Sequence, residues 1–194
     1  SLLIDCGANV DARPEHLVQF AQMGSIYYEN VMGKKNPTVA LLNIGTEEEK
    51  GNQLVKDTKP LMKECKNINY IGSVEARELV SGAADVIVCE AFVGNVVLKF
   101  FEGLALTLFG SLKKGLMSST RTKLGALLVK PALKGLKNQF DTSSQGGAPL
   151  LGLKGLVVKA HGNSSSKEIE IALKQCISFK KQKINEKIKE SICD

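Results

Sequence analysis

Short apolar runs alternate with helical stripes of apolar residues along this chain of 194 residues. The runs are typical of strands that are buried on both faces of a sheet, and the stripes repeat at the 3.6-residue period of a helix. The pattern predicts strands at residues 2–5, 38–44, 69–71, 86–89 and 155–159, and helices from Pro14 onward and at residues 53–66, 74–80 and 164–192. Such alternation predicts an α/β fold with a largely parallel sheet, formed as a single domain over residues 1–194.

The central unit of the pattern is residues 85–109, where a buried strand, a tight turn at 90–95 and an apolar helix follow one another. Asn95 would then lie at the start of the helix. It would face the crevice outside the carboxyl ends of the strands, where parallel sheets bind ligands. In the simpler alternative, Gly94 turns the chain and Asn95 only caps the helix.

Four polar loops, residues 6–13, 45–52, 90–95 and 160–166, each follow a predicted strand. In a parallel sheet these loops would share one edge. Together they offer the candidate binding side chains Asn9, Asp11, Thr46, Lys50, Asn52, Asn95, His161 and Asn163. A lysine among amides and glycine-rich backbone suits the binding of a phosphate or a polarised carbonyl.

Each of these candidates has a structural alternative. The loop at 45–52 is not a P-loop, because it lacks the Gly-Lys-Ser/Thr order. Lys50 could be a helix-surface lysine paired with Glu47, and His161 could be a structural loop histidine instead of a general base. No His, Cys or Asp cluster has metal-ligand spacing, so the sequence predicts neither a metal nor another cofactor.

The net charge of +6 is local. Residues 104–140 contain seven basic side chains and no acidic one, interleaved with apolar positions. This pattern predicts an amphipathic helical hairpin that turns near Ser118 and touches an anionic membrane surface. The expected membrane contacts are Leu112, Leu116, Met117, Leu124, Leu127 and Leu128. Alternatively, the hairpin packs on the partner in a homodimer and its lysines are simply solvated.

The remaining composition excludes several protein classes. Five scattered cysteines without CxxC spacing indicate reduced thiols in a cytosolic protein, and no signal peptide or membrane-spanning run is expected. Nothing resembles a nucleic-acid-binding motif, so no nucleic acid partner is expected. The chain begins inside an apolar run, and we therefore expect it to be part of a longer protein.

Four segments carry a family resemblance: LLIDCGANVDARPEHLVQFAQMGSIY, LLNIGTEEEKGN, FVGNVVLK and GGAPLLGLKGLVVKAHG. They resemble the phosphate acyltransferases of bacterial phospholipid synthesis. The resemblance implies a three-layer α/β/α fold related to isopropylmalate dehydrogenases and phosphotransacetylases. It also implies a homodimer that lies peripherally on the inner face of the cell membrane. The implied reaction transfers an acyl group from acyl carrier protein to inorganic phosphate.

The family's activity residues fall on Lys50 and Asn95. Gly45, Gly94, Gly146 and Gly147 lie in the same motifs and are expected to contact substrate. We expect Lys50 to hold phosphate or the oxyanion, and Asn95 and the N–H groups at the helix start to donate hydrogen bonds. Cys89 could in principle act as a nucleophile, but its apolar strand would keep the thiol protonated.

The sequence departs from the family pattern at Glu90-Ala91, where Asp-Gly is more usual, and at Ser144-Gln145, where a tyrosine is expected nearby. Three other functions are considered. They are an acyltransferase that uses acyl-coenzyme A, a dehydrogenase of the related fold, and a non-catalytic module that binds membrane or carrier protein. The dehydrogenase would need metal-binding carboxylates and a nucleotide loop, and neither pattern is visible.

Overall fold

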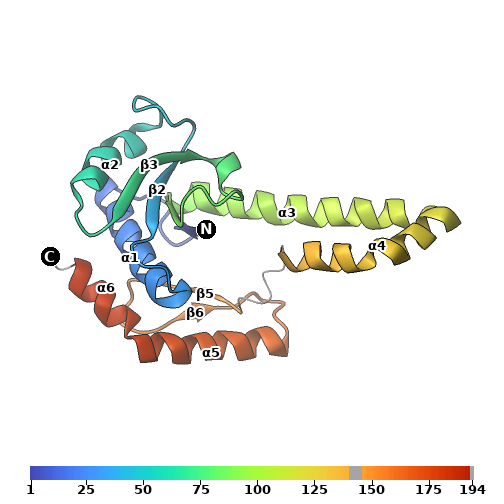
Figure 1. The fold of residues 1–194 in the computed structure, drawn as a ribbon. Coiled ribbons are helices and arrows are strands. Elements are labelled where there is room, and N and C mark those ends of the chain that lie inside the picture. The colour runs from blue at the N-terminus through green and yellow to red at the C-terminus, as the bar shows by residue number, and fades with distance from the viewer. Residues whose placement is uncertain (140–145, 193–194) are drawn as a thin grey trace.

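The computed structural model describes residues 1–139 and 146–192, in which helices flank a parallel sheet (Figure 1). The strands are β1 (Leu2–Ile4), β2 (Thr38–Asn43), β3 (Asn69–Glu75), β4 (Val86–Val88), β5 (Ala148–Pro149) and β6 (Val158–Lys159). The helices are α1 (Pro14–Met32), α2 (Gln53–Glu64), η1 (Ala76–Glu78), α3 (Ala91–Leu116), α4 (Thr120–Gln139), α5 (Ser166–Gln182) and α6 (Ile184–Ile192). Phe140 and Ser144-Gln145 lie outside the described residues.

The main sheet has the order β1-β4-β2-β3, and each pair of neighbours is parallel. Alternate residues of β2 face opposite sides of the sheet. Val39 and Leu41 pack with α1, α2 and α6, whereas Ala40 and Leu42 pack with the first turns of α3. The structure therefore confirms the predicted three-layer α/β/α fold.

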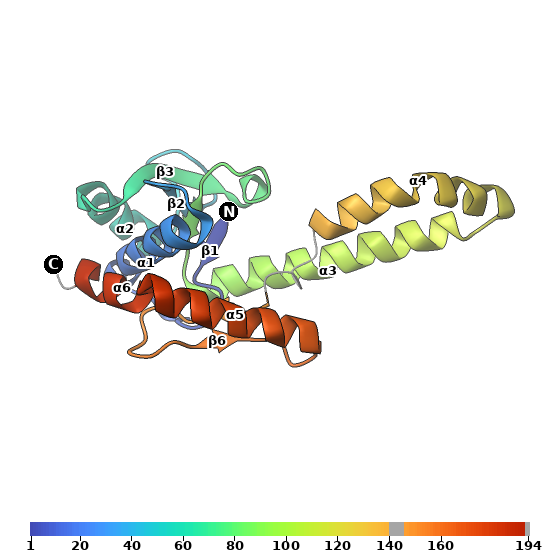
Figure 2. The same cartoon turned by 60° about the horizontal axis from the view of Figure 1, so that its bottom comes forward.

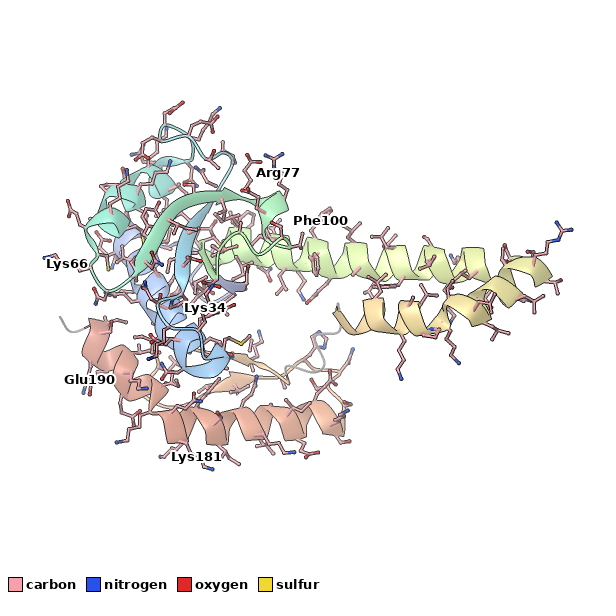
Figure 3. All side chains as sticks on the ribbon, viewed as in Figure 1. Lys34, Lys66, Arg77, Phe100, Lys181 and Glu190 are labelled. Atoms are coloured by element: carbon pink, nitrogen blue, oxygen red, sulfur yellow. The ribbon has the colours of Figure 1, made fainter. Side chains whose placement is uncertain are left out.

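The helical hairpin protrudes from this body. In both views α3 and α4 run side by side away from the sheet (Figures 1 and 2). The turn between them, residues 117–119, is where the sequence predicted it. Figure 3 shows Phe100 on the part of α3 nearest the sheet. This residue is 70% exposed. Large apolar side chains are exposed along both helices, so the hairpin presents apolar surface that the described residues do not cover.

The sequence analysis predicted no run able to cross a membrane. The length and composition of α3 contradict that prediction. The 26 residues of α3 include an 18-residue window with mean hydropathy 1.6, and only 6% of that window is buried. The charged side chains in the first part of α3, Lys99 and Glu102, form an ion pair of 2.8 Å. Length and composition alone do not distinguish a membrane span from an apolar helix of a soluble protein.

Several predicted element boundaries were wrong. β3 continues to Glu75 and is followed by one 3-10 turn, where a helix over residues 74–80 was expected. The expected terminal helix breaks at Lys183, whose φ of 52° lies in the left-handed region. The strand expected at residues 155–159 contributes only Val158–Lys159, which pairs antiparallel with β5 in a separate sheet.

Candidate functional site

Three parallel strands, β1, β4 and β2, end at one edge of the main sheet, and the candidate residues follow them. Residues 5–13 follow β1, residues 44–52 follow β2, and α3 begins after β4. The structure therefore gathers three of the four predicted loops. The fourth loop follows β6 and belongs to the small antiparallel sheet, so the prediction that it shares this edge was wrong.

The buried carboxylate of Asp5 organises the loop after β1. It accepts hydrogen bonds from the N–H groups of Gly7 (3.0 Å), Ala8 (3.0 Å) and Asn9 (2.8 Å), and from the Asn9 side-chain amide (3.0 Å). The carbonyl of Asn9 in turn accepts the N–H of Ala91 at 3.1 Å. Asn9 therefore joins the loop to the start of α3, and its side-chain amide is already engaged by Asp5.

The protonation of Asp5 follows from this arrangement. Burial alone would raise its pKa, but the hydrogen bonds from Ala8, Asn9 and Gly7 outweigh burial and hold the pKa below its ordinary value of 3.8. A carboxylate with a lowered folded-state pKa stabilises the fold above the pKa of the unfolded chain. That contribution is lost as the pH falls through the folded-state pKa.

Asp5→Asn is therefore expected to lower the free energy of unfolding at pH 7 by about 1–3 kcal/mol, because an amide cannot accept all four hydrogen bonds. The variant should also lose less further stability than the parent as the pH falls below about 5. Urea titrations over a pH series would measure both effects, with Asp57→Asn on the exposed face of α2 as the control. Parallel pH curves for Asp5→Asn and the parent would contradict this account.

The start of α3 differs from the prediction. The carboxylate of Glu90 caps the helix by accepting the N–H groups of Phe92 and Val93, so the helix begins at Ala91. Asn95 is thus inside the first turns and is not the cap. The N–H of Gly94 donates to the carbonyl of Glu90 at 3.0 Å. The prediction that the backbone N–H groups at Gly94 and Asn95 face a ligand was wrong, because they belong to the helical ladder.

Close packing fixes where Asn95 lies. A Cβ atom added to Gly94 would lie 1.9 Å from the carbonyl oxygen of Asp5, so only glycine lets α3 approach β1 this closely. Asn95 is exposed, and its Oδ1 lies 4.0 Å from the position of a Cβ added to Gly7. Asn95 therefore lies beside the loop that Asp5 organises.

Lys50 is exposed in the loop after β2, before the start of α2. The alternative that it is a helix-surface lysine was therefore wrong. Asn52 is the N-cap of α2 and accepts the N–H of Val55 at 2.9 Å. Asn43, at the end of β2, donates to the carbonyls of Gly45 (2.9 Å) and Lys50 (3.1 Å). The loop is thus held from below by a buried amide.

Lys59 in α2 is a residue that the sequence analysis missed. It is only 3% exposed, and its Nζ donates to the carbonyls of Glu47 (3.1 Å), Glu48 (2.7 Å) and Lys50 (3.0 Å). Lysines are rarely buried, so its residue type gave no warning. The spacing of Lys59 along α2 does indicate burial, because Lys59 follows Val55 by four residues and precedes the buried Met62 by three.

An apolar cavity of about 300 Å³ opens between the Lys50 loop and α3. Leu42, Val88 and Cys89 line it from the strands, and Val55 and Val93 from the helices. Its polar residues are Asn43, Asn52 and Glu90, whose side chains already bond to nearby backbone. Burial raises the pKa of the Cys89 thiol far above its ordinary value, so this thiol stays protonated and unreactive.

The other predicted residues lie elsewhere or in loops. Gly146 packs against α5, and Gly147 packs against Val158 and Lys159 in the small sheet. His161 is exposed, and its Nδ1 accepts the N–H of Asn163 at 3.2 Å.

Three predicted residues lie in the loops at the edge of the main sheet. Gly45 is buried beside Glu47 and Lys50, whereas Asp11 and Thr46 are exposed in their loops. Their contacts with substrate stay predictions.

Among residues 1–139 and 146–192, no group of three or more His, Cys, Asp or Glu side chains could hold a metal ion. The arrangement at the sheet edge instead combines the exposed cation of Lys50, the exposed amide of Asn95 and an apolar cavity. Such a set can bind an oxyanion beside an apolar group.

Comparison with known proteins matches residues 1–187 to a family described as fatty acid synthesis protein. A phosphate acyltransferase of Clostridium acetobutylicum is 52% identical over 187 residues, which cover 96% of this chain and 56% of that protein. Phosphate acyltransferases of Clostridium novyi and Brevibacillus brevis are each 50% identical, over 98% and 99% of this chain and 57% of theirs. The chain thus spans little more than half the length of these curated relatives.

Proposed function

Because this chain belongs to the fatty acid synthesis protein family, we propose that its protein is an acyltransferase that moves a fatty acyl group from acyl carrier protein to inorganic phosphate. In this reaction a phosphate oxygen attacks the thioester carbonyl and forms a new C–O bond. The C–S bond breaks, and the sulfur leaves as the thiol after taking up the proton lost by phosphate. The product is an acyl phosphate for phospholipid synthesis.

The observation that carries this proposal is the apolar cavity between the loop after β2, which carries Lys50, and α3. It suits the part of an acyl chain nearest the thioester, because its polar side chains are engaged with backbone and its interior is aliphatic. It suits phosphate poorly, since the Glu90 carboxylate lies on its wall. Phosphate would instead bind at the exposed ammonium of Lys50, whose loop contributes Ile44 and Asn52 to the cavity wall.

These positions suggest different roles for Lys50 and Asn95 in the proposed reaction. Lys50 supplies a positive charge for phosphate or for the oxyanion that develops on the carbonyl. The Asn95 amide would supply a directional hydrogen bond from the first turns of α3. Because the Gly94 N–H is used within α3, oxyanion stabilisation falls on side chains more than on the helix start.

The donor is the finer part of the proposal. The lysine-rich hairpin would attract an acidic carrier protein, and such attraction mainly raises the association rate. Turnover should be measured with phosphate and either acyl-carrier protein or acyl-coenzyme A, using the protein as its gene encodes it. We expect acyl phosphate from the carrier-bound donor, less efficiently at high salt. Turnover with acyl-coenzyme A alone would favour the phosphotransacetylase-like alternative, and no turnover with either donor would refute the acyltransferase proposal.

We also propose that the α3–α4 hairpin rests on the anionic inner face of the cell membrane. Leu127 and Leu128 are 67% and 84% exposed, and the basic residues interleave with such apolar positions. An acyl phosphate has a fatty chain, so release beside lipid suits the product. The same apolar surface could instead form the seam of a homodimer.

Vesicle sedimentation with anionic lipid separates these two possibilities. Leu116→Glu and Leu128→Glu are each expected to reduce binding severalfold, because a charge near the apolar interface opposes insertion. The matched control is Leu173→Glu, which changes an exposed leucine on α5, outside the hairpin. Unchanged sedimentation of both hairpin variants, together with their dissociation into monomers in light scattering, would assign the surface to the dimer.

A further inference from the structure

We propose that Lys59 is a positioning residue, which holds the loop that carries Lys50 in the shape needed for acyl transfer. This inference rests on the proposed function for the role of Lys50. It rests on the structure for the contact itself, in which the buried Lys59 ammonium meets three carbonyls of the loop at 2.7–3.1 Å.

The donors and acceptors match one to one. A lysine ammonium has three N–H donors and no acceptor, and the loop offers three carbonyls, from Glu47, Glu48 and Lys50. A buried charge is costly unless it is fully hydrogen-bonded. Lys59 meets this condition through backbone alone, so the loop is the partner that makes its burial tolerable.

The loop depends on this contact because it has little regular structure of its own. It contains a turn bond from the Lys50 N–H to the Glu47 carbonyl at 3.2 Å, and Asn43 binds its two ends. Gly51 has a φ of 116°, and a Cβ there would lie 2.8 Å from the Asn43 Oδ1. Lys59 is a side chain that reaches the backbone in the middle of the loop, at the carbonyls of Glu47 and Glu48.

The position of Lys50 follows from this anchoring. The Lys50 carbonyl accepts two hydrogen bonds, from Asn43 and from Lys59. These bonds fix the backbone from which the Lys50 side chain projects toward solvent. Lys59 itself is buried under the loop and does not contact the exposed side, so it acts through Lys50.

Lys63 provides a matched control on the same helix. It lies one turn after Lys59, is exposed, and pairs with the Glu48 carboxylate at 2.7 Å instead of with backbone. Lys63→Met therefore removes a lysine that touches the same loop without removing its backbone support. Exposed pairs of this kind contribute little.

The test compares Lys59→Met with Lys63→Met in the full protein. Lys59→Met is expected to lower turnover on the order of 10²-fold, since small displacements of a reacting group cost this much. It should also speed amide hydrogen exchange in residues 45–51. Lys63→Met should match the parent in both measurements. In the Lys50→Ala background, Lys59→Met should cause no further loss of turnover, because its effect passes through Lys50.

Equal exchange in residues 45–51 for Lys59→Met and the parent would overturn the proposal, as would additive losses of turnover in the double variant. If Lys59→Met does not fold, Lys59→Arg is used, because it keeps the charge while its planar donors cannot match the three carbonyls. An inactive parent would refute the proposed function alone, since the exchange measurement still tests the loop.

Discussion

Lys50→Ala is expected to reduce the turnover of acyl phosphate by about 10²–10³-fold, the usual cost of removing one group that stabilises a developing oxyanion. The reason is that Lys50 is exposed in the loop after β2, where its charge would bind phosphate in the proposed reaction, while the apolar cavity between that loop and α3 would hold the acyl chain. The matched control is Lys56→Ala, which removes an exposed lysine from α2 and should leave turnover unchanged.

The kinetic form of the loss identifies what Lys50 holds. A rise in KM for phosphate at constant kcat indicates that Lys50 binds phosphate equally in the ground and transition states. A fall in kcat indicates that it acts on the oxyanion of the transition state. Asn95→Ala should lower kcat in either case, since an amide donor serves the carbonyl oxygen. Turnover of both variants within tenfold of the parent would show that neither residue is catalytic.

Gly94→Ala is expected to destabilise the fold by about 1–3 kcal/mol or more, because overpacking at a rigid contact forces the backbone to move. The added Cβ would lie 1.9 Å from the Asp5 carbonyl oxygen and 3.0 Å from the Cys89 sulfur. The first of these neighbours is backbone, which cannot rotate away. The start of α3 would therefore shift from β1, and Asn95 would shift with it.

The control for this change is Gly103→Ala in the same helix. Gly103 is exposed, and an added Cβ there would meet no atom within 4 Å. Alanine should stabilise that position by about 1 kcal/mol, because it favours a helix more than glycine does. Thermal and urea unfolding of the two variants measure both effects. Equal stability of Gly94→Ala and Gly103→Ala would contradict the packing described for α3.

Much of the fold was predictable because its strands are buried on both faces. The runs at β2 and β4 contain only apolar residues apart from Thr38 and Asn43 at their ends, and the hairpin turn follows from Ser118, Ser119 and Thr120. The start of α3 was missed because Glu90 is its cap, and glutamate is not among the preferred N-cap residues. Local preference pointed to Asn95 instead.

The site was predictable only where parallel strands placed it. The loops after β1, β2 and β4 meet because parallel strands share their carboxyl edge. Residues 155–159 look like another buried strand, yet Val158 and Lys159 pair with Ala148 and Pro149. The direction of that pairing is a tertiary property that a run of apolar residues does not encode. Lys59 was missed for a related reason, since its burial depends on carbonyls of a loop.

The neighbour of β1 in the sheet also has a bearing on how the protein folds. β1 pairs with β4, and the contact between Asp5 and Cys89 spans 84 residues of sequence. Closing so long a loop costs chain entropy before the contacts between β1 and β4 can stabilise the closed chain. Pairings between such distant segments therefore form slowly. We therefore expect β2, β3 and β4 to assemble first and β1 to dock last. Asn9 and Gly94 reach their partners only at that step, so we expect the candidate site to be completed in the final stage of folding and to be the first part that opens when the protein unfolds locally.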